Sequence, residues 1–135
     1  MKQALFLISR LHEKGNRFIV DMLKKNGMQE LVPSHGDILS VLYHNEKATM
    51  KDIADKIHRT KPTVTVLVDK LEKLDFVKRV KSSDDNRITY IVLTEKAKQF
   101  RKVFEKISDE LNTMFYKNLS KEEALKLDEI LVKML

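Results

Sequence analysis

The chain has 135 residues, of which 42% are hydrophobic and 34% charged, and its formal net charge at pH 7 is +6. The length suits one folded domain, and the composition excludes an intrinsically disordered chain. The absence of cysteine excludes disulfides, thiol redox switches and cysteine-based zinc sites. The basic excess favours an anionic partner, which is either nucleic acid or an anionic membrane.

The basic excess is concentrated in the middle of the chain. Residues 47–90 hold eleven Lys and Arg against seven Asp and Glu, whereas residues 1–46 hold six against five and residues 95–135 hold nine against eight. The apolar run at residues 4–8 is too short for a signal peptide or a membrane span. The four histidines are far apart and lack metal-ligand spacing. We therefore expect a cytoplasmic protein with no membrane partner, metal or cofactor.

The first third of the chain predicts two helices. Apolar residues recur at helical spacing over residues 3–25, although Gly15 is a weak point, and Asn26–Gly27 can terminate this helix. Ser34 and Asp37 then form the pattern Ser-x-x-Asp, which is typical of a helix start. The helix that it opens is expected to reach about His44.

The middle third predicts two further helices joined by a tight turn. Thr49-x-x-Asp52 repeats the capping pattern before a short helix that ends near Ile57, and Thr60 can cap the next helix, which reaches about Leu74. One stripe of this last helix is apolar at i, i+3, i+4 and i+7, and is expected to be buried. Its members are Val64, Leu67, Val68 and Leu71.

After Leu74 the apolar period changes from that of a helix to that of a strand. Residues 76–80 and 88–93 are rich in β-branched and aromatic residues, and the polar segment 81–87 between them predicts a hairpin with a long loop. Thr94 can cap a long helix with an apolar stripe from Phe100 to Phe115, and Ser120-x-x-Glu123 opens one more. The expected fold is mainly α with a small β-hairpin wing.

Two short helices followed by a hairpin are the parts of a winged helix-turn-helix, in which the second helix enters the major groove of DNA. The side of this helix opposite the apolar stripe offers Thr63 and Thr65 as hydrogen-bond donors and Val66 as an apolar contact for a thymine methyl group. Lys61 and Lys70 suit phosphates, and Pro62 lies in the first turn, where no N–H is needed. The alternative is that Val66 is a stray surface residue and the lysines are solvated.

The loop of the hairpin carries Arg87 two residues after Asp85. An arginine at a wing tip can enter the minor groove, and the aspartate can orient its guanidinium by a charge-assisted hydrogen bond. The alternative is an ordinary surface ion pair, which contributes little.

The sequence resembles the MarR family of transcriptional regulators. Residues 53–57 and 63–72, which read IADKI and TVTVLVDKLE, are similar to the paired helices of the family. The more specific likeness is Asp85-x-Arg87 followed by a hydrophobic strand and Leu93–Thr94, which is similar to the family's wing signature. The element order matches over essentially the whole chain. The resemblance therefore implies a winged helix-turn-helix at residues 30–93 within a single domain of residues 1–135.

The resemblance implies a dimeric regulator, usually a repressor, that binds a pseudo-palindromic site in double-stranded DNA. By position it implies that Lys61, Pro62, Thr63, Thr65, Val66, Asp85 and Arg87 lie where family members contact DNA. Thr60 and Lys70 complete the set of candidates for contact with DNA. Relatives often have Arg at the position of Val66 and Ser at that of Pro62, so these departures concern the base preference and not the docking of the helix in the groove. His58–Arg59 stands where many relatives have a glycine and an apolar residue, so the turn itself is expected to be unusual.

The resemblance also implies that residues 1–29 and 94–135 form a helical dimerisation lobe in which terminal helices of two subunits interlace. The apolar candidates for that interface are Leu5, Ile8, Leu11, Ile130, Leu131 and Met134. The alternative is that they complete the core of one subunit. Family members often bind a small aromatic effector between the lobes, where Arg10, His12 and Asn16 are candidate lining residues, although a solvated helix face is the competing interpretation.

The alternatives to DNA binding are a protein–protein contact module and an enzyme. A winged-helix module for protein–protein contact would bind without salt dependence and without a need for Arg87. An enzyme is not expected, because the sequence contains no Ser/His/Asp set, no Gly-rich phosphate loop and no paired carboxylates in a plausible cleft.

Overall fold

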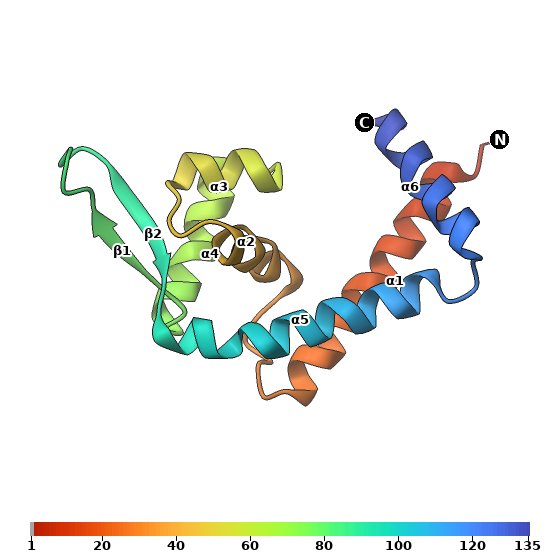
Figure 1. The fold of residues 1–135 in the computed structure, drawn as a ribbon, viewed down its shortest axis with the longest axis horizontal. Coiled ribbons are helices and arrows are strands. Elements are labelled where there is room, and N and C mark those ends of the chain that lie inside the picture. Colours follow the sequence, from red (N-terminus) through yellow and green to blue (C-terminus); the bar gives the residue numbers. More distant parts are fainter. Residues whose placement is uncertain (1) are drawn as a thin grey trace.

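The computed structural model describes residues 2–135, within which the chain forms six helices and one two-stranded hairpin (Figure 1). The elements in chain order are α1 (Ala4–Lys25), α2 (Pro33–His44), α3 (Met50–Ile57), α4 (Lys61–Lys73), β1 (Val77–Lys81), β2 (Thr89–Leu93), α5 (Glu95–Tyr116) and α6 (Lys121–Met134). The prediction of a mainly helical chain with a hairpin wing is confirmed. Among the described residues, no helix is long and apolar enough to cross a membrane.

The elements gather in two parts that the long helix α5 connects. Figure 1 shows α2, α3, α4 and the hairpin packed together at one end, while α1 crosses α5 and α6 follows the far end of α5, near both termini. The strands pair antiparallel with Val77 opposite Leu93 and Lys81 opposite Thr89. Ala48, just before α3, forms a further bridge to Ile91 of β2. The hairpin is thereby joined to the helical part of its lobe.

The core of the lobe lies between α2, α3, α4 and the base of the hairpin. Its most buried side chains are at most 2% exposed, and they include Ile38, Leu39, Ile53, Val64, Val68, Leu71, Phe76 and Ile91. The predicted stripe of α4 is therefore confirmed at Val64, Val68 and Leu71, whereas Leu67 is only half-buried. Leu67 packs at the rim of this core.

Most of the predicted helix starts are confirmed by hydrogen bonds. The hydroxyl oxygens of Thr49, Thr94 and Ser120 accept from backbone N–H groups three residues later, at 3.1 to 3.2 Å. The carboxylates of Asp52 and Glu123 accept in return from the N–H of Thr49 and Ser120. Local side-chain chemistry therefore sets these boundaries.

The predicted start of α2 is wrong. The helix begins at Pro33, before Ser34, because proline has no N–H to satisfy and its φ suits the first helical position. The backbone N–H of Val32 donates to Nδ1 of His35 at 2.9 Å, so a histidine ring performs the role expected of a carboxylate. The predicted strands, residues 76–80 and 88–93, begin one residue too early in both cases, and β1 also ends one residue later, at Lys81.

Candidate nucleic-acid interface

The helix α4 presents one face to solvent because its other face is anchored in the core. Thr60 caps its first turn, since its hydroxyl oxygen accepts from the N–H of Thr63 at 3.4 Å. Val64 and Val68 are completely buried, whereas Lys61, Pro62 and Val66 are exposed. The division of faces that a recognition helix requires is therefore present.

The hydroxyl groups on this face are partly engaged within the helix. The hydroxyl of Thr65 donates to the carbonyl oxygen of Lys61 at 2.9 Å, and Thr65 is half-buried. The hydroxyl of Thr60 donates to the hydroxyl oxygen of Thr63 at 2.9 Å, which leaves the hydrogen of Thr63 available to another acceptor. Of the two threonines predicted to donate, only Thr63 keeps its donor in this conformation.

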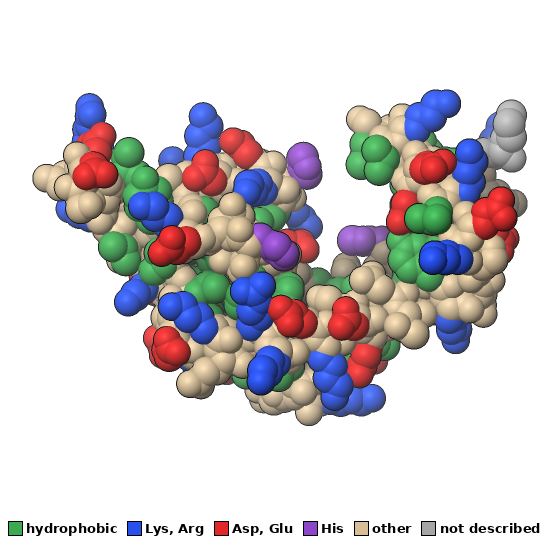
Figure 2. Space-filling model, in the orientation of Figure 1, with side chains coloured by type: hydrophobic (Ala, Val, Ile, Leu, Met, Phe, Trp, Pro, Cys, Tyr) green, Lys and Arg blue, Asp and Glu red, His purple; other side chains and the backbone are tan. Residues whose placement is uncertain are grey.

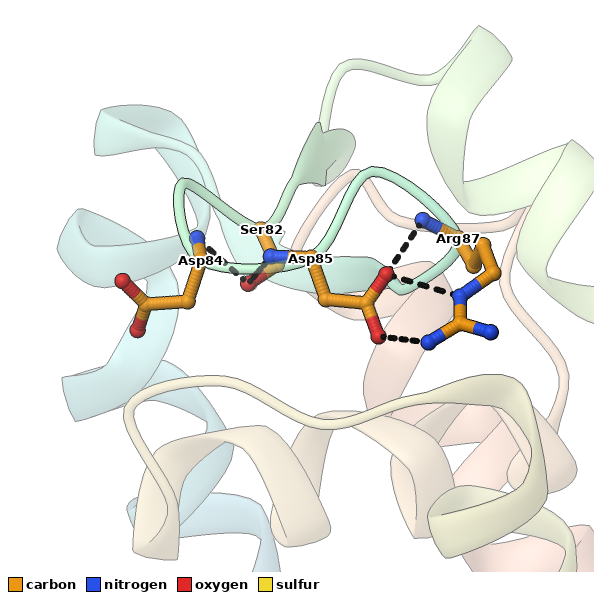
Figure 3. Close-up of polar contacts among 4 residues, drawn as sticks. All are labelled: Ser82, Asp84, Asp85 and Arg87. Carbon is orange, nitrogen blue, oxygen red and sulfur yellow. Dashed lines mark hydrogen bonds and ion pairs between the residues drawn. The ribbon is translucent and has the colours of Figure 1, made fainter.

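The loop between β1 and β2 holds Asp85 and Arg87 in a fixed arrangement (Figure 3). Oδ1 of Asp85 accepts from the backbone N–H of Arg87 at 3.0 Å and from its Nε at 3.1 Å, while Oδ2 accepts from Nη2 at 3.1 Å. The hydroxyl oxygen of Ser82 accepts from the N–H groups of Asp84 and Asp85, which holds the turn beneath this pair. The aspartate therefore orients the arginine, as the sequence predicted.

This arrangement keeps both charges in place while the arginine remains open to a partner. The hydrogen bonds from the Arg87 side chain and backbone lower the pKa of Asp85, and the bond to Asp85 raises the pKa of Arg87. The side chain of Arg87 is 89% exposed, whereas that of Asp85 is 33% exposed. An exposed, oriented guanidinium at the tip of a hairpin is suited to a phosphate-lined groove.

Arg79 on β1, which was not among the predicted site residues, joins the hairpin to α4. Its Nη2 donates to Oδ1 of Asp69 and its Nη1 to Oε1 of Glu72, each at 2.7 Å. Sequence alone offered one signal, two acids three residues apart on α4 followed by an arginine on the next strand. The pairing depends on how the strand packs against the helix, and no sequence pattern shows that packing.

The turn between α3 and α4 has a left-handed backbone at a residue that is not glycine. His58 has φ of 55°, and its position ends α3, where the N–H of Arg59 donates to the carbonyl of Ala54 at 3.1 Å. A left-handed conformation is costly for a residue with a Cβ atom, which confirms that this turn is unusual.

The molecule is hollowed between the lobe and the arm formed by α1 and α6 (Figure 2). The crevice is lined by His12, Asn16, Asp37, Arg59, Phe115 and Tyr116, among others. Arg10, predicted as a lining residue, does not border this crevice and lies with Leu7 and Lys14 on α1. An adjoining cavity of about 200 Å³ lies between α1, α2 and α5, with Leu23, Phe100 and Phe104 in its wall.

The predicted dimerisation residues lie on the helices at the two ends of the chain. Leu5, Ile8, Leu11, Ile130 and Met134 are exposed, with Leu5 at 77% and Met134 at 64%, whereas Leu131 is half-buried. The alternative that these six side chains complete the core of one subunit is therefore wrong for five of them. Within residues 2–135, no group of three or more His, Asp or Glu side chains is placed to hold a metal ion.

Comparison with known sequences identifies the MarR family over the lobe and a related transcriptional regulator over nearly the whole chain. The sequence profile of the MarR family matches residues 31–89. The HTH-type transcriptional regulator SarZ of Staphylococcus epidermidis is 30% identical over 128 residues, which cover 95% of this chain and 83% of SarZ. The regulator MhqR of Bacillus subtilis is 30% identical over 94 residues, which cover 70% of this chain but only 63% of MhqR.

Comparison with solved structures extends this likeness to the whole architecture. The structure of Staphylococcus aureus MepR in complex with DNA matches with a TM-score of 0.88 and 26% sequence identity, and the match covers 99% of this chain and 97% of that one. The arrangement of lobe, hairpin and terminal helices is therefore that of a winged-helix regulator.

Proposed function

Because the chain belongs to the MarR family of winged helix-turn-helix transcriptional regulators, we propose that it is a homodimeric repressor that binds a pseudo-palindromic site in double-stranded DNA. The observation that carries this proposal is the pairing of two exposed surfaces on one lobe. These surfaces are the first turns of α4 and the oriented guanidinium of Arg87. We expect the protein to act in the cytoplasm, by binding rather than by catalysis.

The proposed contacts divide by chemistry. Lys61 and Lys70 contact phosphates, while Thr63 and Val66 face base edges in the major groove. Arg87 enters the adjacent minor groove with Asp85 as its support. Their position in the basic middle part of the chain and the solved complex of MepR with DNA support this assignment.

The proposed dimer joins the exposed apolar faces of α1 and α6 to those of a second copy. A two-fold dimer places two recognition helices about one DNA turn apart, which matches a two-fold site. Leu5 and Met134 are largely exposed in one chain, so association would remove their side chains from water.

We also propose that a small aromatic effector controls DNA binding from the region between the lobes. The cavity of about 200 Å³ has apolar walls that include Phe100 and Phe104, and the neighbouring crevice offers the cation Arg59 beside Asp37. A ligand there would touch α2 of the lobe and α5, which connects the lobe to the arm. Such a ligand would alter the spacing of the two recognition helices.

Selection of bound duplexes from random DNA tests this function directly. We expect an enriched site with two-fold symmetry, bound by a dimer. Fluorescence anisotropy then compares the wild type with Arg87→Ala over a range of salt concentrations. The variant should bind more weakly, and its salt slope should fall by about one per subunit.

Arg101→Ala is the matched control, because Arg101 also pairs with an acid at 2.9 Å but lies on α5. An unchanged slope in Arg87→Ala contradicts the wing contact. Binding that is insensitive to salt, or enrichment of no duplex, favours a winged-helix module for protein–protein contact.

A further inference from the structure

The exposed face of α4 near its first turns is poor in hydrogen-bonding groups that can read bases. We infer that the recognition helix reads thymine methyl groups, with Val66 as the residue that determines this specificity. The inference rests on the proposed function, because it concerns which base pairs the same surface selects.

The first observation is the absence from α4 of arginine, asparagine and glutamine. Arginine or lysine reads guanine, and asparagine or glutamine reads adenine, through paired hydrogen bonds. The helix has the sequence KPTVTVLVDKLEK, so lysine is its only side chain of this kind, and Lys61 and Lys70 are the proposed phosphate contacts. The nearest arginine before it, Arg59, lines the crevice between the lobe and the arm.

The second observation concerns the acids of α4, which could otherwise accept from the amino group of cytosine. Both are held by the same guanidinium, since Arg79 donates to Asp69 and to Glu72 at 2.7 Å. Each ion pair occupies one carboxylate oxygen, Oδ1 of Asp69 and Oε1 of Glu72, and ties the carboxylate to β1. The acids therefore contribute to the placement of the hairpin rather than to base selection.

The third observation is that the helix backbone already engages one of the two candidate hydroxyls. The hydroxyl of Thr65 donates to the carbonyl of Lys61, so its hydrogen is unavailable. Thr63 retains a single hydrogen to donate, which is too little to distinguish the base pairs by a paired contact. Its methyl group adds to the apolar character of the face.

The fourth observation is the exposure of Val66. Its side chain is 69% exposed, and it is the only large apolar residue of α4 in that state, while Val64 and Val68 are fully buried. Pro62 lies four residues earlier, on the same side of the helix, and is also exposed. Two exposed apolar groups on an otherwise polar surface match the methyl group that thymine presents in the major groove.

The wing favours the same base composition through a different groove. An arginine inserted into a minor groove binds best where A·T pairs narrow it and strengthen its negative potential. Arg87 is oriented and exposed at the hairpin tip. The expected operator therefore has thymines facing α4 and an A·T-rich flank facing the wing.

Replacement of thymine by uracil tests this inference, because uracil forms the same base pair and lacks only the methyl group. In the selected duplex, each thymine is replaced in turn, and affinity is measured by fluorescence anisotropy for the wild type and for Val66→Ala. One or two positions per half-site should lose about fourfold in affinity with the wild type, as expected for one buried methyl group. The variant should bind the thymine duplex more weakly and lose this discrimination.

Val20→Ala is the matched control, since Val20 is also an exposed valine in a helix, at 45%, but lies on α1, nine residues after Leu11, the last predicted dimerisation residue of that helix. It should discriminate thymine from uracil as the wild type does, and thermal unfolding should show both variants folded. The inference is overturned if uracil is tolerated at every position, or if Val66→Ala keeps the full discrimination. If no duplex binds, the proposed function fails and the inference fails with it, whereas specific binding without a uracil effect overturns only the inference.

Discussion

Arg79 and Asp69, ten residues apart in the chain, bring β1 and α4 together through a hydrogen-bonded ion pair of 2.7 Å. The same guanidinium reaches Glu72, and the hydrogen bond to Asp69 is the largest cause of the raised pKa of Arg79. One side chain thus connects the wing to the recognition helix. The contact links the two elements that carry the surfaces proposed to contact DNA.

Replacement of Arg79 by alanine should affect DNA binding more than stability. The pairs are partly exposed, so their loss should cost about 1 kcal/mol or less in the free energy of unfolding. The freed carboxylates of Asp69 and Glu72 would repel phosphates, and the wing would lose its ion-paired contact with α4, so affinity should fall by on the order of tenfold. Thermal unfolding and fluorescence anisotropy measure the two effects separately.

The variant Arg79→Lys refines this test, because lysine keeps the charge but cannot pair with both acids in a fork. We expect it to bind with intermediate affinity. Arg101→Ala, which breaks the Arg101–Glu105 pair on α5, should leave affinity unchanged. A loss of affinity no greater than that of the control would show that Arg79 does not position the wing.

Features set by neighbouring residues could be predicted from the sequence. Thr60, Thr94 and Ser120 cap helices because each hydroxyl bonds an N–H only three residues away, and the apolar period locates the core faces. The start of α2 was missed because Pro33 and His35 satisfy the helix end in a less common way. A Ser-x-x-Asp pattern alone does not exclude a different helix start one or two residues away.

The site could be predicted in part, for the same physical reason. Asp85 and Arg87 are two residues apart, so their pairing follows from the local turn. The role of Arg79 depends on how a strand packs on a helix, which no local pattern determines. The engagement of the Thr65 hydroxyl depends on a side-chain conformation that the sequence does not specify.

Glycine at either of two left-handed positions should stabilise the protein. His58 and Asp75 have φ of 55° and 62°, which a residue with a Cβ atom adopts at a cost of about 1 kcal/mol. His58→Gly and Asp75→Gly should therefore each raise the melting temperature by a few degrees. Asp55→Gly, inside α3, is the control. It should lower the melting temperature, because the backbone there is already helical and glycine is unfavourable in a helix interior. Equal destabilisation by all three would contradict the assigned strain.

Stability should fall between neutral and mildly acidic pH because of His35. The ring is 4% exposed, its Nδ1 accepts from the N–H of Val32, and its buried Nε2 has no partner among residues 2–135. Burial, aided by Lys70, lowers its pKa from 6.5, so the unfolded chain binds the proton more readily. The stability is complete above about pH 6.5 and declines as the pH falls toward the folded pKa.

His35→Gln isolates this effect, since glutamine can still accept from the Val32 N–H but does not titrate in this range. Urea unfolding at fixed protein concentration, from about pH 7 to about pH 5, should give a shallower decline for the variant. The raised pKa of Asp37 acts in the opposite direction, and it is common to both proteins, so the difference between them reports His35. Parallel curves would show that the histidine does not contribute.

Alanine at Gly15 should stabilise α1, whereas alanine at Gly27 should destabilise the chain. A Cβ atom at Gly15 would lie 3.9 Å from Cδ1 of Leu111, an ordinary contact, and alanine in a helix interior is favoured over glycine by about 0.5–1 kcal/mol. Gly27 has φ of 72°, so alanine there strains the turn that ends α1. Urea unfolding at one protein concentration should place the two variants on opposite sides of the wild type. Destabilisation by Gly15→Ala would contradict the first half of this prediction, and an unchanged stability of Gly27→Ala would contradict the second.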